Sequence, residues 1–155
     1  MKYIKFITAL IITLFCTHAV TAQNVLNNRA DNIVGSYEGV QEGYKFKAKI
    51  VKLTDGTYRG QVFWMENDRD AQGNKLLDTK NPDRSLRSTP ADRVVLFSGL
   101  TYDDKRHEWN GCKIYDPIRG IRAKMVASFT ADGQLRIKGS LLGISESVYW
   151  KPLTR

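Results

Sequence analysis

Lys45-Phe46-Lys47-Ala48-Lys49-Ile50 decides the fold class, because charged and apolar residues alternate along it with a period of two. In an extended strand that period places the three lysines on one face and the three apolar residues on the other, whereas a helix would mix them. The same alternation recurs over residues 121–129 and 135–139. Each of these strands is therefore predicted to bury one face and to expose the other to water.

Turn signals separate the alternating runs. Asp55-Gly56 and Asp132-Gly133 each lie between two runs and predict type I′ hairpins, in which positive φ favours glycine. Gln41-Glu42-Gly43 and Asp103-Asp104-Lys105 predict slightly longer loops, and Pro117 marks a turn over 116–120. The pattern predicts an up-and-down meander of eight strands, at about 34–40, 44–54, 57–65, 93–101, 106–115, 121–130, 134–140 and 145–151.

Such a meander removes both sheet edges by closing into a barrel. An eight-stranded barrel has an interior just wide enough to be filled by side chains or to hold one small ligand. The predicted lining mixes the large residues Phe46, Tyr58, Met125 and Phe129 with the small residues Ala48, Gly60, Ala123, Ala127 and Gly139. The small residues either leave a cavity or make room for neighbouring aromatic rings, and the sequence leaves both alternatives open.

Glu66 to Asp92 is a long polar interruption of the strand pattern. Loops this long are uncommon in compact domains and tend to be lids or binding loops, so we expect this one to flank the barrel mouth. Within it, Asn81-Pro82-Asp83 predicts a helical turn that presents Asp83 and Arg87 on one face. The pair would recognise a polar headgroup. Alternatively, Asn81 caps the turn and Arg87 ties the loop to the barrel through Asp116.

The first 22 residues have the pattern of a secretory signal peptide. Lys2 and Lys5 precede an apolar run, and small residues precede the expected cleavage site after Ala22. The run is shorter than the roughly 20 residues that span a bilayer, so the mature chain is expected to have no transmembrane segment. We predict export to the periplasm or the medium, a flexible leader over 23–32, and one barrel domain over 33–155.

Composition narrows the choice of partners. The formal net charge is +8, and the chain remains basic without the signal peptide. In an exported protein this charge favours an anionic envelope component over nucleic acid as a partner. Cys112 is the one cysteine of the mature chain, so no internal disulfide is expected.

Metal and catalytic patterns are weak. Asp68 to Asn74 resembles the start of a calcium loop, but Thr79 stands at the twelfth position, where a bidentate glutamate is needed. His107 is the single histidine of the mature chain, which argues against the usual zinc sites. We therefore assign no metal, no cofactor and no catalytic residue. A hydrolase that uses Asp83, Tyr115 and Asp116 is kept as a less favoured alternative.

Several motifs resemble one known family. They are Asn81-Pro82-Asp83 with Leu86-Arg87, Trp109-Asn110-Gly111, Ile114-Tyr115-Asp116-Pro117 with Gly120, and Leu135, Ile137 and Gly139 ahead of Trp150. In order and spacing, from Gly35 to Trp150, the chain resembles the secreted bacterial family catalogued as domain of unknown function 2147. The resemblance implies a lipocalin-like β-barrel in the envelope of Gram-negative bacteria and implies no established activity.

This chain departs from the family pattern at two positions. The family often has a second glycine where Cys112 stands and a lysine where Ile121 stands. If that lysine contributes to a shared site, Arg119 or Arg122 would have to replace it here.

The leading functional hypothesis is a barrel that binds a small apolar or amphipathic molecule in its interior or at its mouth. The alternative is an envelope interaction module with a filled barrel, which docks a protein or an anionic glycolipid through its long loop and basic face. The ligand-binding residues assigned from the sequence are Phe46, Tyr58, Met125, Phe129, Asn81, Asp83, Arg87, Trp109 and Tyr115.

Overall fold

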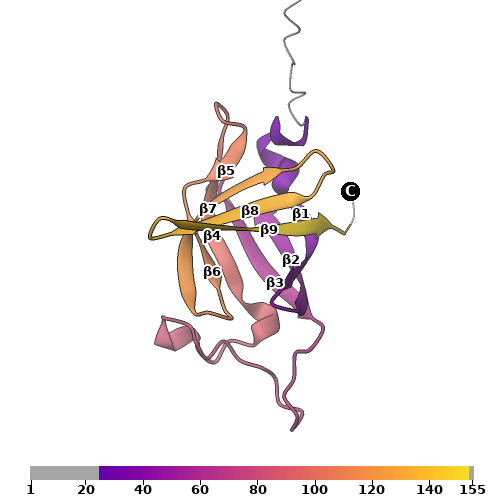
Figure 1. Cartoon of the computed structure of the whole chain (residues 1–155), viewed down its shortest axis with the longest axis vertical. Helices are drawn as coiled ribbons and strands as arrows, with labels where there is room; N and C mark the ends of the chain where they lie inside the picture. The colour runs from indigo at the N-terminus through magenta and orange to yellow at the C-terminus, as the bar shows by residue number, and fades with distance from the viewer. Residues whose placement is uncertain (1–24, 154–155) are drawn as a thin grey trace, which may run out of the picture.

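The computed structural model describes residues 25–153 and is an all-β barrel (Figure 1). The predicted signal peptide and its cleavage site lie outside these residues. Four short 3-10 turns occur, at η1 (Val25–Asn27), η2 (Ala30–Ile33), η3 (Arg84–Leu86) and η4 (Ala91–Arg93). The strands are β1 (Gly35–Gln41), β2 (Tyr44–Lys52), β3 (Tyr58–Met65), β4 (Val95–Asp103), β5 (Glu108–Asn110), β6 (Lys113–Asp116), β7 (Ile121–Phe129), β8 (Leu135–Leu141) and β9 (Ile144–Pro152).

All neighbouring strands pair antiparallel, in the order β5-β4-β3-β2-β1-β9-β8-β7-β6. A further pairing between β5 and β7 closes the ring. The short strands β5 and β6 both pair with β7 and together fill one strand position, so the barrel is eight-stranded. The predicted fold class, a closed antiparallel meander, is confirmed.

The strand predicted over 106–115 is broken at Gly111 and Cys112. Gly111 has φ of +91°, and a Cβ there would lie 2.7 Å from Thr101 Oγ1, so the backbone bends where a larger residue would not fit. Trp109 pairs with Ala127 before the break, and Tyr115 pairs with Arg122 after it. The register thus shifts by one residue, which turns the side chains of β6 to the opposite face from a continuous strand.

The tight turns also differ from the prediction in detail. Gly56 and Gly133 have positive φ, but Asp55 and Asp132 do not, so these are three-residue loops rather than type I′ turns. The type I′ pattern, with two successive positive φ values, occurs instead at Glu42-Gly43 and at Leu142-Gly143.

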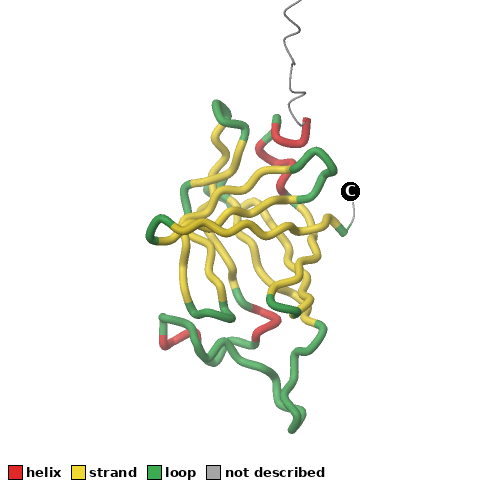
Figure 2. The backbone as a smooth tube through the Cα atoms, viewed as in Figure 1, coloured by secondary structure: helices red, strands yellow, loops and turns green. Residues whose placement is uncertain are grey.

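Residues 25–33 cover one end of the barrel, which we call the closed end (Figure 2). The indole of Trp109 donates to the carbonyl of Ala30 at 2.9 Å, and the hydroxyl of Tyr58 donates to Asp31 at 2.6 Å. Asn27 bonds both backbone groups of Phe129, at 2.7 and 3.0 Å. The polar composition predicted a flexible leader over 23–32. The described part of it packs here because Asn27, Ala30 and Asp31 form hydrogen bonds with barrel residues.

The centre of the barrel is filled with aromatic rings. Trp150 packs against Phe46 and Phe97, with ring centroids 5.6 and 6.5 Å apart. A Cβ on Gly60 would lie 2.4 Å from Phe97, and a Cβ on Gly39 would lie 2.6 Å from Phe46. These glycines therefore accommodate aromatic neighbours and do not leave space for a ligand.

Candidate functional site

The opposite end of the barrel, which we call the open end, carries the turns β1–β2, β6–β7 and β8–β9. It also carries residues 66–94 between β3 and β4, which we call the long loop. The long loop extends below the barrel in Figure 2 and includes η3 and η4. The segment expected at the mouth from sequence, Glu66 to Asp92, therefore lies at this end.

A cavity of about 370 Å³ lies between the long loop and the barrel interior. We call it the lumen cavity. Barrel residues Phe46, Val62, Leu96 and Trp150 form its inner wall, and the long loop contributes Leu76, Leu77 and Ala91. Its volume is in the range of small-molecule sites, and its lining is mainly apolar.

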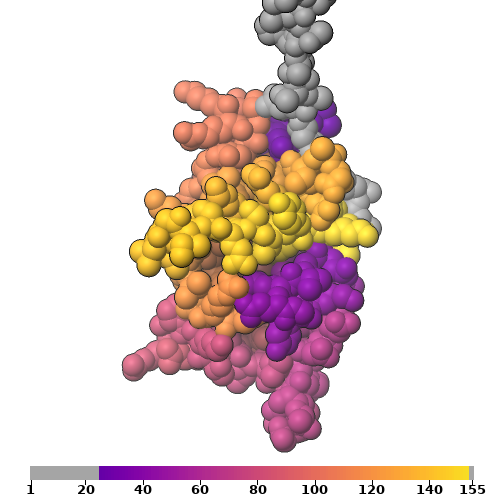
Figure 3. All heavy atoms as spheres, viewed as in Figure 1, coloured from indigo at the N-terminus to yellow at the C-terminus, as the bar shows by residue number. Residues whose placement is uncertain are grey.

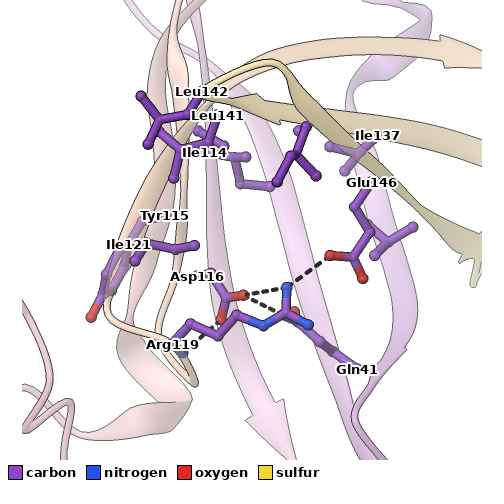
Figure 4. A pocket seen from close by; sticks show the side chains of 14 residues that line it. Gln41, Ile114, Tyr115, Asp116, Arg119, Ile121, Ile137, Leu141, Leu142 and Glu146 are labelled. Carbon is purple, nitrogen blue, oxygen red and sulfur yellow. Dashed lines mark hydrogen bonds and ion pairs between the residues drawn. The ribbon is translucent and has the colours of Figure 1, made fainter.

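A second cavity of about 310 Å³ lies beside it, under the β8–β9 hairpin (Figure 4). We call it the hairpin cavity. Its apolar walls come from the inward faces of four strands, with Ile114, Ala123, Ile137, Ile144 and Val148. Ile114 and Val148 also border the lumen cavity, so the two cavities share a wall.

Charged and polar groups gather at one side of the hairpin cavity. Arg119 lies on the β6–β7 turn and bonds Glu146 of β9 and Glu42 of the β1–β2 turn, both at 2.8 Å. Asp116 lies 3.7 Å from Arg119 and accepts from Gln41 at 2.8 Å (Figure 4). Hydrogen bonding to Glu146 raises the pKa of Arg119 above its usual value. One arginine thus links three elements across the rim, in pairs exposed enough to exchange partners.

The long loop is attached to the barrel by a buried polar network. Tyr115 donates to one oxygen of Asp78 at 2.7 Å, and Asn81 donates to the other at 2.6 Å. Asp78 and Asn81 are each only 3 % exposed. Burial, followed by the hydrogen bond to Asp78, raises the pKa of the Tyr115 hydroxyl. Lys80 adds a bond to the carbonyl of Ile118 at 2.6 Å.

Tyr115 belongs to this attachment. It shares a sheet face with its partner Arg122, and the Arg122 guanidinium lies 5.1 Å from the centre of its ring. Ala123, next to Arg122, lies on the cavity side. The side chain of Tyr115 therefore points away from the barrel interior and is buried beneath Asp78 and Asn81, although the residue borders both cavities.

The turn after Asn81 has the expected helical form but a different cap. Asp83, and not Asn81, occupies the N-cap and accepts from the backbone and hydroxyl of Ser85 at 2.9 and 2.7 Å. The Ser85 hydroxyl bond is the main reason that the pKa of Asp83 is lowered. Arg87 donates to the carbonyl of Asn81 at 2.8 Å. Among the ion pairs of residues 25–153, none joins Arg87 to Asp83 or to Asp116.

The nine residues assigned from sequence divide into three groups. Phe46 and Tyr115 border the cavities at the open end. Asn81, Asp83 and Arg87 organise the long loop. The remaining four, Tyr58, Trp109, Met125 and Phe129, are buried in the core, and neither cavity is lined by them.

Several cavity residues were not assigned from the sequence. Ile114 stands in the middle of the wall, but a continuous strand with Trp109 inside would have turned it outward. Asp78 and Gln41 lack any local pattern that separates them from ordinary loop and turn residues. Arg119 was considered only as a substitute for a family lysine, and it does lie at the rim.

The segment that resembles a calcium loop is a turn held by its own hydrogen bonds. Asp70, in the segment that resembles a calcium loop, accepts from the backbone amides of Gln72 and Asn74 at 2.9 and 2.8 Å. No group of three or more potential metal-ligating side chains occurs in the part of the chain that the structure describes.

Cys112 is half-buried at the break between β5 and β6, and burial raises the pKa of its thiol to about 11.

The fold of this chain, an up-and-down barrel with one covered end and one hollow end, is lipocalin-like. Residues 35–152 match domain of unknown function 2147, described as an uncharacterized protein conserved in bacteria, and the chain belongs to this family. The resemblance identified from the motifs is thereby confirmed.

One solved structure with a similar fold is protein HP1028 from the human pathogen Helicobacter pylori, which is described as belonging to the lipocalin family. The two chains are 22 % identical, with a TM-score of 0.61 over 79 % of this chain and 83 % of the other. No curated protein matches this chain. Within residues 25–153, no helix is long and apolar enough to cross a membrane.

Proposed function

We propose that this protein is an exported carrier that binds a small apolar or amphipathic molecule at the open end of its barrel. The observation that carries the proposal is the lumen cavity, an apolar space of about 370 Å³ beneath an ordered long loop. Apolar cavities of this size at the mouth of a barrel are the usual place for a hydrophobic ligand.

The construction of the cavity supports binding over simple packing. The inner wall consists of buried, well-packed side chains such as Val62 and Leu96, whereas the outer wall belongs to the long loop. The loop is fixed to the barrel at Asp78, and its two arms are joined to each other where Leu77 and Pro90 form a β-bridge. Its apolar residues Leu76, Leu77 and Ala91 are therefore held over the cavity and do not collapse into it.

Polar groups at the rim suit the headgroup of an amphipathic ligand. Gln41 borders both cavities, and Arg119, Asp116 and Glu146 lie on the side of the hairpin cavity. A ligand chain in the apolar space would bring its polar end to these groups, which can donate or accept hydrogen bonds.

The first test is native mass spectrometry of the protein purified from the organism that encodes it, together with analysis of an organic extract. We expect a stoichiometric added mass that disappears on denaturation. In parallel, the recombinant protein is titrated with anilinonaphthalene sulfonate, an amphipathic fluorophore. Absence of both the added mass and saturable fluorophore binding would overturn the proposal.

A matched pair of variants places the site. Ala91→Trp adds a large ring to the wall of the lumen cavity, whereas Ala71→Trp adds the same ring at an exposed position of the same loop. We expect Ala91→Trp to weaken binding at least about ten-fold, since the ring occupies the ligand's volume, and Ala71→Trp to leave it unchanged. Equal affinity in the two variants, with both folded by circular dichroism, would exclude the lumen cavity as the site.

A further inference from the structure

The outward face of β6, β7 and β8 carries basic residues and no acidic residue. Lys113, Lys124, Arg136 and Lys138 are all exposed there, and we call them the basic row. Between residues 113 and 152 the acidic residues are Asp116, Asp132 and Glu146. Asp116 and Glu146 border the hairpin cavity, and Asp132 lies in a turn at the closed end.

The strand register brings these like charges together. Lys113 is directly opposite Lys124, and Lys124 is opposite Ser140, two residues from Lys138 on the same face. Arg136 lies two residues before Lys138 on β8, so both side chains are on the same face. Like charges directly opposite in a sheet destabilise it, and neighbours on the diagonal are still within reach of long side chains. The fold thus keeps an arrangement that is unfavourable for the isolated protein.

On the other side of the barrel, two of the outward lysines of β2 have acidic partners. Lys47 of β2 is opposite Glu38 of β1, and Lys45 pairs with Glu66 at 3.6 Å. Within residues 25–153, no member of the basic row takes part in an ion pair. The basic row therefore differs from Lys45 and Lys47 in that its charges have no acidic partner on the same face of the described strands.

An exposed aliphatic tip adjoins the basic row. The β8–β9 hairpin crosses the visible face in Figure 3 and ends at Leu142, which is 94 % exposed, with Ile144 at 77 %. Leu142 has φ of +51°, a conformation in which asparagine or glycine is usual and a branched apolar side chain is disfavoured. A leucine at this position therefore has neither burial nor backbone preference to explain it.

We propose that the basic row and the Leu142-Ile144 tip dock the protein on the surface of an anionic lipid bilayer. The row would contact lipid phosphates, and the two aliphatic side chains would enter the acyl region. The aliphatic side chains of the tip favour hydrocarbon as the partner. Tyr149, exposed opposite Arg136, is of a residue type that suits the interface of a bilayer as well as base stacking, so the tip decides between the two partners.

This docking mode places a cavity at the membrane. Leu142 and Ile144 also border the hairpin cavity, so insertion of the tip brings the opening of that cavity to the lipid surface. An amphipathic molecule could then pass between bilayer and barrel without crossing water. The docking itself does not require the proposed function, because the basic row lies outside both cavities.

The test is flotation of the mature protein with vesicles of phosphatidylglycerol and phosphatidylethanolamine, compared with vesicles of phosphatidylcholine alone. We expect binding to the anionic vesicles at low salt, and a decrease as the salt concentration rises past the point where screening is effective. Binding to both kinds of vesicle alike, or to neither, would overturn the proposal.

Two charge variants with equal net charge localise the surface. The first carries K113Q, K124Q, R136Q and K138Q, and the second carries K45Q, K47Q, K49Q and K105Q on β2 and a closed-end turn. We expect the first to reduce vesicle binding at least about ten-fold and the second to have a much smaller effect, because each basic residue near the surface contributes separately. Equal losses of vesicle binding in the two variants would show that binding depends on net charge alone and not on the basic row, which would overturn the proposal.

Leu142→Asn tests the tip without risk to the fold, because asparagine adopts positive φ more readily than leucine. We expect unchanged or higher thermal stability and weaker vesicle binding. If Leu142→Asn has no effect while single-stranded DNA competes fully for the basic row, the surface is a general polyanion site and the lipid assignment fails.

The basic-row variant also separates this proposal from the proposed function. Its cavity walls are intact, so it should still bind anilinonaphthalene sulfonate while losing vesicle binding. A protein that binds vesicles but no small molecule supports the docking alone.

Discussion

The two ends of the barrel are built from the same alternating strands, but one end is filled with side chains and the other is hollow. At the closed end, Trp109 and Phe129 pack edge to face with ring centroids 5.7 Å apart, and residues 25–33 bond across them. At the open end, the inward residues Ala123, Gly139 and Ile144 line the hairpin cavity of about 310 Å³, and the long loop covers the lumen cavity of about 370 Å³. Large inward residues close one end, and smaller ones with a braced loop leave the other hollow.

The comparison separates two uses of small residues. Gly39 and Gly60 lie against aromatic rings, so a glycine in the lining is no sign of a cavity. Ala123 and Gly139 lie where no large ring follows, and they do border a cavity. The filled positions have an aromatic ring directly opposite, Phe46 for Gly39 and Phe97 for Gly60, whereas Gly139 has Met125 and Glu146, and a single strand does not reveal this difference.

The largest expected effect contrasts one aromatic residue from each end. Trp109→Ala removes a fully buried ring and should reduce the free energy of unfolding by about 3–5 kcal/mol. Phe46→Ala removes a half-buried ring at the lumen cavity and should reduce it by about 1–2 kcal/mol, because less area leaves contact. Urea unfolding of the two variants measures the difference. Equal losses would mean that the open end is as tightly packed as the closed end.

A smaller effect is expected where the long loop is attached. Tyr115→Phe removes the hydroxyl that bonds Asp78 and should cost about 1–2 kcal/mol, because a buried carboxylate loses one of its two side-chain donors. Hydrogen exchange should show faster exchange at the loop amides of Asp78 and Ala91 and unchanged exchange in β7. Uniform acceleration across the barrel would show that the loop and the barrel unfold as one unit.

A pH effect is expected at the closed end. Hydrogen bonds from Lys52 and Tyr58 lower the pKa of Asp31 in the folded protein. A lowered folded-state pKa stabilises the protein above the unfolded value of about 3.9, and this contribution is lost as pH falls through the folded value. Asp31→Asn should therefore be less stable than the native protein at pH 7, and the difference should shrink as pH falls below the unfolded value of about 3.9. A difference that persists in acid would point to lost packing.

The smallest effect concerns Cys112, which lies between the two ends. With a thiol pKa of about 11, the thiolate fraction at neutral pH is roughly 100-fold below that of an ordinary exposed cysteine. Alkylation by iodoacetamide should be correspondingly slow in the folded protein and normal in urea. Rapid alkylation of the folded protein would show that the break between β5 and β6 opens frequently.

Much of the fold was accessible from sequence because period-two alternation is local. Lys45 to Ile50 identifies a strand and its buried face without knowledge of any partner. The turn types were less accessible, since Asp-Gly fits both a two-residue and a three-residue loop and register decides between them.

The site was less accessible because it depends on events that are not local. The one-residue shift at Gly111 turns Tyr115 outward and Ile114 inward, which reverses their roles from those of a continuous strand. Asp78 matters only because the loop returns to the barrel above Tyr115. The polar segment 25–32 likewise folds only because Trp109, Tyr58 and Phe129 offer partners far away in the chain.

The seam between β1 and β9 has a consequence for the order of folding. These strands are joined by only two residue pairs, Tyr37 with Pro152 and Glu38 with Lys151. Trp150, on β9, is also the ring around which Tyr37, Phe46 and Phe97 gather. A nascent chain that lacks β9 can neither close the wall nor complete its core, and such contacts between distant segments form slowly. The barrel can therefore close only when β9 is present, so we expect the contacts between β1 and β9 to be among the last to form.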